Sequence, residues 1–242
     1  RGIVRGGLVL TQNNQQVMPN IYVDLVARNL SLPNFVILDA TIKGQLVNLA
    51  RSPSQLQINA TGVNIANQPI RGLQLNFNGT QAAHTLDVKI DSVRGQVQAR
   101  LKGSIDLTRK QWQGLLGNGQ IGTKYAKLQQ LQPAQMLLNW QQPQIQLAAH
   151  CWQMAGQSGR LCLKDNLVAS ATQGQVNLSL QQIDSQIFSV VMPNDIAWSG
   201  TLNGNALVHW RKNQRPTVNA SFYSDNGVFG TAAQIPEENP TT

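Results

Sequence analysis

The sequence has few charged and few aromatic residues. Only 12% of its 242 residues are charged and 5% are aromatic, whereas about 25% of the residues in a typical soluble domain are charged. Glutamine, asparagine, serine and threonine supply the polarity instead. Uncharged polar residues that alternate with aliphatic ones are typical of a β-sheet with one solvated and one apolar face. The composition therefore indicates a β-rich protein.

Catalytic constellations are also scarce. The three histidines are His84, His150 and His209, and no two carboxylates have a spacing that suggests acid–base catalysis. A Gly-x-Gly-x-x-Gly string at 117–122 lacks the preceding strand and the later acidic residue of a dinucleotide site, so we interpret it as a flexible turn. We expect no enzymatic activity, no metal site and no cofactor.

Long apolar runs are missing as well. No stretch has the length of a transmembrane helix, and the chain starts at Arg1 without an initiator methionine or a signal peptide. We therefore expect this chain to be a piece of a longer protein.

The net charge of +8 raises nucleic acid or an anionic membrane as partners. The basic residues are scattered, however, and the nearest approach to a cluster is Arg109-Lys110 and Arg211-Lys212 with Arg215. Neither group is interleaved with aromatic residues that could stack on bases. We therefore expect no nucleic-acid partner and attribute the dispersed charge to solubility.

The two cysteines, Cys151 and Cys162, flank a segment with Gly156, Ser158 and Gly159, which predicts a turn. The two thiols could then face each other across a hairpin, and they would pair in an oxidising compartment. We predict a disulfide, with two reduced buried thiols as the alternative.

Alternation with a period of two dominates the sequence. Between 97 and 107 every odd residue is apolar or glycine, and every even residue is polar. Similar segments recur along the chain and predict a continuous array of strands over 1–233, followed by a polar tail at 234–242. Two stretches, Thr108 to Leu116 and Ile183 to Met192, are predicted as short helices.

Nearly every predicted strand has an apolar face, but few elements are left to cover these faces. Either the sheet curls so that its apolar face meets itself, or something apolar occupies the space. We predict an all-β fold, an elongated curved sheet with an apolar groove and one or two short helical insertions. A sealed sandwich or barrel core is the alternative. The predicted groove residues are Leu86, Val88, Ile90, Val97, Ala99, Leu101, Ile105, Leu107, Ile145, Leu147, Leu178, Leu180 and Val208.

Several short patterns follow one another between about 105 and 210. They are Leu138-Asn139-Trp140, Ile145-Gln146-Leu147, Cys151-Trp152, Gly159-Arg160-Leu161-Cys162-Leu163, Gly174-Gln175-Val176-Asn177-Leu178, Met192-Pro193 and Trp198-Ser199-Gly200-Thr201-Leu202-Asn203-Gly204. In this order they resemble the TamB family and, more distantly, the AsmA-like group. The resemblance covers a little under half of the chain.

The resemblance implies that the sheet forms a half-tube groove (a β-taco) with an apolar inner face. It also implies a periplasmic segment of an inner-membrane-anchored protein in a Gram-negative bacterium. It also implies a TamA-like outer-membrane barrel as partner and phospholipid as ligand. An apolar groove of this kind would conduct acyl chains between the two membranes and support outer-membrane biogenesis. The alternative function is a chaperone-like scaffold that helps to assemble nascent outer-membrane proteins and autotransporters by β-strand augmentation.

Overall fold

The computed structural model describes residues 1–12, 19–33, 35–65, 68–124, 126–185, 196–224 and 226–231. Within these ranges the regular structure consists of nineteen strands, and no α-helix occurs. The predicted all-β fold is confirmed. The chain divides into two compact units, which are described separately below.

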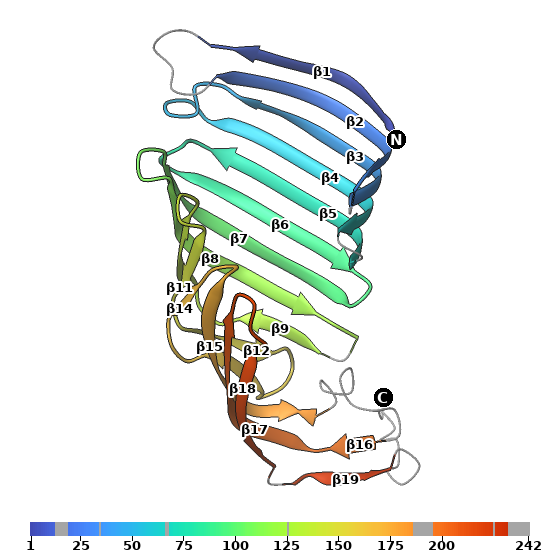
Figure 1. Ribbon diagram of the computed structural model, residues 1–242, viewed down its shortest axis with the longest axis vertical. Coiled ribbons are helices and arrows are strands. Elements are labelled where there is room, and N and C mark those ends of the chain that lie inside the picture. The colour runs from blue at the N-terminus through green and yellow to red at the C-terminus, as the bar shows by residue number, and fades with distance from the viewer. Residues whose placement is uncertain are drawn as a thin grey trace. The chain divides into compact units, whose positions relative to one another are not determined.

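The first unit comprises Arg1–Lys124 and Pro133–Ile145. From β1 to β8 the consecutive strands pair antiparallel (Figure 1). Strand β10 also pairs antiparallel with β8. The strands are β1 (Ile3–Thr11), β2 (Asn20–Leu32), β3 (Phe35–Leu46), β4 (Ser54–Ile65), β5 (Gln68–Gly79), β6 (His84–Ser92), β7 (Gly95–Asp106), β8 (Gln111–Gly122) and β10 (Ala134–Asn139).

The second unit comprises Tyr125–Gln132 and Gln146–Thr242. Its described strands are β9 (Lys127–Gln130), β12 (His150–Met154), β13 (Arg160–Leu163), β14 (Leu167–Ala169), β15 (Gln173–Asp184), β16 (Ile196–Ser199), β17 (Thr201–Arg211), β18 (Thr217–Tyr223) and β19 (Val228–Thr231). Antiparallel pairing runs in the order β9, β12, β13, β15, β17, β18, while β14 also pairs with β15 and β16 pairs with β19. The short strand β11 (Gln144–Leu147) contains the sequence boundary between the units.

The predicted helix at Thr108 to Leu116 is wrong. Residues 107–110 form a turn, and β8 begins at Gln111 and pairs with both β7 and β10. The apolar spacing of Trp112, Leu115 and Leu116 resembles a helix face, but Gly114 lies within this stretch and three more glycines follow in β8, which weakens a helix and suits close strand packing. In the second predicted helix, Ile183 and Asp184 belong to β15, and residues 186–192 lie outside the described ranges. The predicted tail at 234–242 also lies outside them.

A corner crosses β2 to β5 at one level of the first unit. Two consecutive outward residues occur there in each strand, so that inner residues are three positions apart instead of two: Ala27 and Leu30, Ile37 and Ala40, Ala60 and Val63, Ile70 and Leu73. The backbone takes positive φ at Asn29 (49°) and Gly62 (58°). A Cβ on Gly62 would lie 2.4 Å from Leu38 Cδ1, so glycine is needed there. The corner buries Ala40, Ala60 and Val63.

Buried side chains are concentrated at sites such as this corner rather than in one central core. Of the described residues, only thirteen hydrophobic side chains are buried. The chain exposes 16149 Å² of surface, whereas a compact protein of 26.5 kDa would expose about 10,700 Å². Most apolar side chains that face the inside of the sheet therefore stay partly accessible, which argues against a sealed core.

Candidate functional site

Cross-strand register aligns the apolar side chains of the first unit into three parallel rows. Residues directly opposite each other in an antiparallel ladder point to the same face, so each row can be followed from strand to strand. Row 1 is Leu8, Val23, Gly44, Leu56, Phe77, Leu86, Leu101, Leu116 and Ala134. Row 2 is Gly6, Leu25, Ile42, Ile58, Leu75, Val88 and Ala99. Row 3 is Val4, Ala27, Ala40, Ala60, Leu73, Ile90, Val97 and Ile121.

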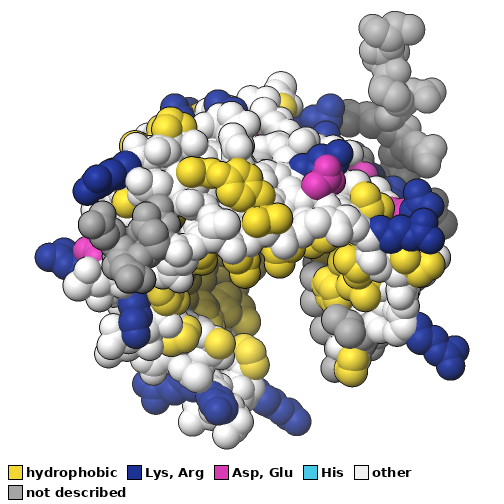
Figure 2. Space-filling view, turned by 90° about the horizontal axis from the view of Figure 1, so that it is seen from above, with side chains coloured by type: hydrophobic (Ala, Val, Ile, Leu, Met, Phe, Trp, Pro, Cys, Tyr) yellow, Lys and Arg dark blue, Asp and Glu magenta, His cyan; other side chains and the backbone are white. Residues whose placement is uncertain are grey.

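We call the residues of rows 1 and 2 on strands β2 to β8 the apolar floor. Its side chains are half-buried, whereas Ala40 and Ala60 of row 3 are buried at the corner. Figure 2, seen from the side of β1, shows hydrophobic side chains lining the hollow behind this strand and many Lys and Arg side chains on the outer surface. The floor is therefore an open apolar surface beside a packed corner.

The corner forms one margin of the floor, and a second margin lies at the other end of the strands. Ser54, at the start of β4, is fully buried and its Oγ accepts a hydrogen bond from Val47 N at 3.0 Å. On β6 and β8, His84 and Trp112 are also buried and are joined by a hydrogen bond of 2.7 Å. The floor is thus bounded on both sides by packed residues.

The outer face of the same strands is polar. Between rows 1 and 2 of the inner face, the outer face carries Asp24, Lys43, Gln57, Asn76, Asp87 and Arg100, each opposite the next. Lys43 pairs with Asp24 at 3.6 Å, and Arg28 pairs with Asp39 at 3.8 Å. Charge is therefore confined to the solvated face, where ion pairs stabilise little but keep the sheet soluble.

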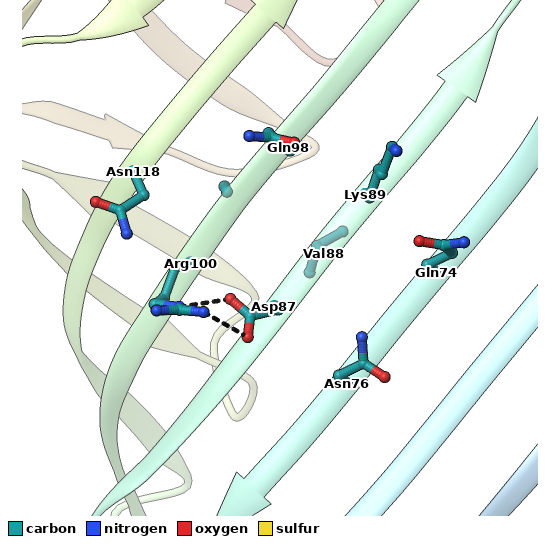
Figure 3. Close-up of a pocket in the computed structure, with 9 residues that line it drawn as sticks. Gln74, Asn76, Asp87, Val88, Lys89, Gln98, Arg100 and Asn118 are labelled. Atoms are coloured by element: carbon teal, nitrogen blue, oxygen red, sulfur yellow. Dashed lines mark hydrogen bonds and ion pairs between the residues drawn. The ribbon is translucent and has the colours of Figure 1, made fainter.

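The best-formed ion pair joins Arg100 and Asp87 in a shallow outer pocket of about 370 Å³ (Figure 3). Arg100 Nε donates to Asp87 Oδ1 at 2.6 Å, and Nη2 donates to Oδ2 at 3.0 Å. These hydrogen bonds, followed by the attraction of the carboxylate, raise the pKa of Arg100 above its ordinary value. The remaining lining is mainly amide, from side chains such as Gln74, Asn76 and Gln98.

The predicted groove residues divide between the two units. In the first unit, four of them belong to the floor: Leu86, Val88, Ala99 and Leu101. Ile90 and Val97 belong to row 3. Ile105 lies opposite Trp112, and Leu107 lies in a turn after β7. Val97 is 42% exposed. Ile145 and Leu147 lie in β11 on either side of the sequence boundary.

The second unit has its own apolar rows. Leu178 lies between Leu163 and Ala206, Leu180 lies between Leu161 and Gly204, and Val208 lies between Val176 and Val218. Leu180 is only 8% exposed, while Val218 on β18 is 62% exposed. The rows therefore become more open toward β18.

The floor also contains residues that are absent from the predicted groove set. They include Leu25 on β2, Ile42 on β3, Leu56 and Ile58 on β4, Leu75 and Phe77 on β5, and Leu116 on β8. The signal that identifies most of them is the alternation already visible in the sequence. Their alignment into rows could not be derived without the register.

The two cysteines are joined in the second unit. Cys151 on β12 lies directly opposite Cys162 on β13, and the structure contains a disulfide between them with an Sγ–Sγ distance of 2.09 Å. The turn between the strands includes Gly156, whose φ is 76°. The predicted pairing across a hairpin is therefore what the structure contains.

Among the described residues, no three His, Cys, Asp or Glu side chains lie close enough together to hold a metal ion. In the same parts of the chain, no helix combines the length and the apolar character needed to cross a membrane.

Comparison with known proteins gives a consistent relationship over nearly the whole chain. A family model described as TamB, N-terminal domain, matches residues 1–241. The chain is 25% identical over 209 residues to the translocation and assembly module subunit TamB of Haemophilus influenzae, which corresponds to 86% of this chain. The chain spans about 15% of the length of this relative. No solved structure matches the chain.

Proposed function

The chain belongs to the TamB family, and from this premise we propose that its apolar floor holds the acyl chains of phospholipids that pass between the inner and outer membranes. The alignment of the two apolar rows of the floor across consecutive strands carries this proposal. Apolar side chains that are aligned in register and still partly accessible form a surface that a hydrocarbon chain can contact.

The free energy of acyl-chain hydration explains why such a surface is useful. An acyl chain of about fifteen methylenes in water costs on the order of 12 kcal/mol, at roughly 0.8 kcal/mol per methylene. Contact with the floor removes part of that cost and leaves the headgroup solvated. Because the attraction is non-directional, a chain can move from one strand to the next without crossing a strongly bound state.

The composition of the rows suits movement better than tight binding. In rows 1 to 3, Phe77 is the one aromatic residue, and the others are Leu, Ile, Val, Ala or Gly. Aliphatic side chains give shallow and similar contacts at every strand, whereas aromatic rings favour particular geometries. The floor is therefore better suited to conduct an acyl chain than to retain it.

The wider setting is part of the same proposal. We place the chain in the periplasm of a Gram-negative bacterium, as a section of an inner-membrane-anchored, non-enzymatic protein. Its partner is a TamA-like outer-membrane barrel, in keeping with the name of the relative as a subunit of a translocation and assembly module. Residues 1–233 then act as one continuous array within a longer one.

Strand β1 favours a second candidate function. All nine of its residues are exposed, it pairs with β2 on one side, and it is the outermost strand of the first unit in Figure 1. An exposed strand edge can receive another strand. A nascent outer-membrane protein is such a partner, as in the chaperone-like alternative.

The lipid proposal is tested by Leu101→Asp with Lys102→Asp as a matched control. The two positions are adjacent on β7, but Leu101 lies on the floor and Lys102 on the outer face. We expect Leu101→Asp to lower the amount of phospholipid that co-purifies with the chain at least about tenfold, because a charge must leave water to meet an acyl chain. Lys102→Asp should leave it unchanged. Equal phospholipid in both variants, with both folded by circular dichroism, would contradict the proposal.

The second candidate is tested by proline at Leu8 and, separately, at Val9. In an antiparallel edge strand, neighbouring N–H groups alternate between the paired side and the free side. One substitution therefore removes a donor toward β2, and the other removes a donor from the free edge. If strand addition is the function, the proline that removes a donor from the free edge should reduce crosslinking to nascent outer-membrane proteins. The pairing of β1 with β2 should remain in that variant. Undiminished crosslinking would exclude it.

A further inference from the structure

One buried pair beside the floor involves a titratable group. Trp112 on β8 donates its indole Nε1–H to Nε2 of His84 on β6 at 2.7 Å, across the intervening strand β7. The other ring nitrogen, Nδ1, lies 2.9 Å from the carbonyl oxygen of Thr80. His84 is 7% exposed and Trp112 is 8% exposed.

Two glycines make room for the indole. Gly103 lies opposite His84 and Gly114 lies opposite Gly103, so a strip of bare backbone runs between the two side chains. A Cβ on Gly103 would be 2.6 Å from Trp112 Cζ2, and a Cβ on Gly114 would be 2.8 Å from Cη2. The indole therefore lies directly on the backbone of β7 and β8, two residues beyond Leu101 and Leu116 of the floor.

The two contacts of the imidazole determine its protonation. A carbonyl oxygen can only accept, so Nδ1 must carry the proton that it shares with Thr80. The indole nitrogen can only donate, so Nε2 must be unprotonated. Both bonds exist together only in the neutral ring with its proton on Nδ1. A second proton would place two donors against each other inside a buried site.

From this geometry we infer that His84 and Trp112 form a pH-sensitive latch at the margin of the apolar floor. While His84 is neutral, the indole covers Gly103 and Gly114. When the ring takes up a second proton, the hydrogen bond is lost and the indole leaves the glycine strip, which extends the accessible inner face beside Leu101. The inference of a latch is based on the two hydrogen bonds of His84, and only the effect of the latch on lipid depends on the proposed function.

The contacts that the His84 ring makes with described residues are to Phe77, Trp112 and the Thr80 carbonyl, which are all uncharged. The ring faces Phe77 on β5, with centroids 5.1 Å apart, and Trp112 on β8, with centroids 6.3 Å apart. Gly79 and Gly103 lie opposite it on the flanking strands. The nearby charged residues of β6 and β7, Asp87 and Lys102, belong to the outer face. Protonation of His84 therefore acts chiefly on its bond to Trp112.

Nuclear magnetic resonance of the ¹⁵N-labelled 242-residue chain tests the latch directly. At neutral pH we expect the proton of His84 on Nδ1, and slow exchange of the Trp112 indole proton with water. As His84 is protonated, exchange of that indole proton should accelerate by about tenfold or more, the factor for losing one buried hydrogen bond. The indole of Trp210 donates to the carbonyl of Ser170 at 3.1 Å and serves as an internal control that should not respond.

Variants separate the latch from a general effect of acid. In His84→Gln the amide oxygen can accept from Trp112 at every pH, so the response should disappear. His150→Gln removes the other buried histidine, which lies 2.9 Å from the Ala148 carbonyl, and should leave the response intact. A neutral His84 with its proton on Nε2, or an unchanged Trp112 indole during protonation of His84, would overturn the inference. Both observations are made on the unsubstituted chain, so they decide the matter even if His84→Gln does not fold.

Discussion

In the first unit, strands β1 to β8 have 9 to 13 residues, whereas β9, β12, β13 and β14 of the second unit have only three to five. A strand of twelve residues presents about six side chains to the inner face. It can bend at a corner, bury some of these residues and leave others open. A short strand presents only two or three side chains to this face and can bury little. In the second unit, a disulfide joins the short hairpin of β12 and β13.

The difference teaches that an open apolar surface needs stabilisation at its edges. In the first unit, the corner at Ala40, Ala60 and Val63 and the margin at Ser54 and His84 are buried, and the floor between them is not. In the second unit, burial is spread over single residues such as Met154, Leu180 and Leu202.

A charge at the corner should have the largest effect. Val63 is 3% exposed, and Val63→Asp would bury an unpaired carboxylate. We expect the free energy of unfolding of the first unit to fall by about 4 kcal/mol or more. Gln57→Asp, on the solvated face of the same strand, should change it by less than about 0.5 kcal/mol. Chemical denaturation, followed by hydrogen exchange in each unit, measures the free energy of unfolding of both variants. An equal loss in Val63→Asp and Gln57→Asp would contradict the role of the corner.

Removal of the disulfide should affect the second unit alone. Cys151 and Cys162 are 11 positions apart, and closing a loop of this length in the unfolded chain stabilises by roughly 2–3 kcal/mol. We expect the double variant Cys151→Ala, Cys162→Ala to lose about this amount in the second unit, with unchanged hydrogen exchange in β2 to β7. Loss of protection in both units would show that the disulfide stabilises more than its own hairpin.

Filling a glycine beneath an aromatic ring should have an intermediate effect. On β15, a Cβ at Gly174 would lie 2.1 Å from Cζ2 of Trp210, while at Gly72 on β5 the nearest atom is 3.9 Å away. Gly174→Ala should therefore displace the indole and cost about 1–3 kcal/mol, detectable as a change in tryptophan fluorescence and a lower thermal midpoint. Gly72→Ala is the control and should be close to neutral.

The smallest effect is expected at the outer ion pair. Arg100 and Asp87 are well aligned, but both side chains are about 40% exposed. Arg100→Ala should shift the thermal midpoint by less than about 2 °C, and salt should reduce the shift further. A large, salt-independent shift would mean that the outer face stabilises the sheet more than its exposure allows.

The sequence was sufficient to predict which side chains face the same way. Alternation in β7 predicted that Val97, Ala99 and Leu101 share a face, and the pairing of Cys151 with Cys162 followed from the turn between them. Both are local patterns that a strand or hairpin expresses directly. Alignment of eight strands into rows is a property of register, which depends on turn geometry and therefore could not be derived.

Glycine was the main source of error. The string at 117–122, predicted as a flexible turn, is part of β8, where Asn118 with φ of 50° lies at a register shift. Gly114 and Gly103 mark a close approach of the Trp112 ring. In a long sheet, glycine can indicate a ring packed against backbone as well as a turn, and one sequence does not distinguish the two cases.

The central claim is that the inner face of the first unit meets acyl chains while the outer face meets water. A photo-crosslinking scan in cells, with one photoreactive residue at a time from Val97 to Lys102, tests it most directly. We expect phospholipid adducts at 97, 99 and 101 and none at 98, 100 and 102, in step with the alternation of β7. Adducts at every position, or at none, would contradict the claim.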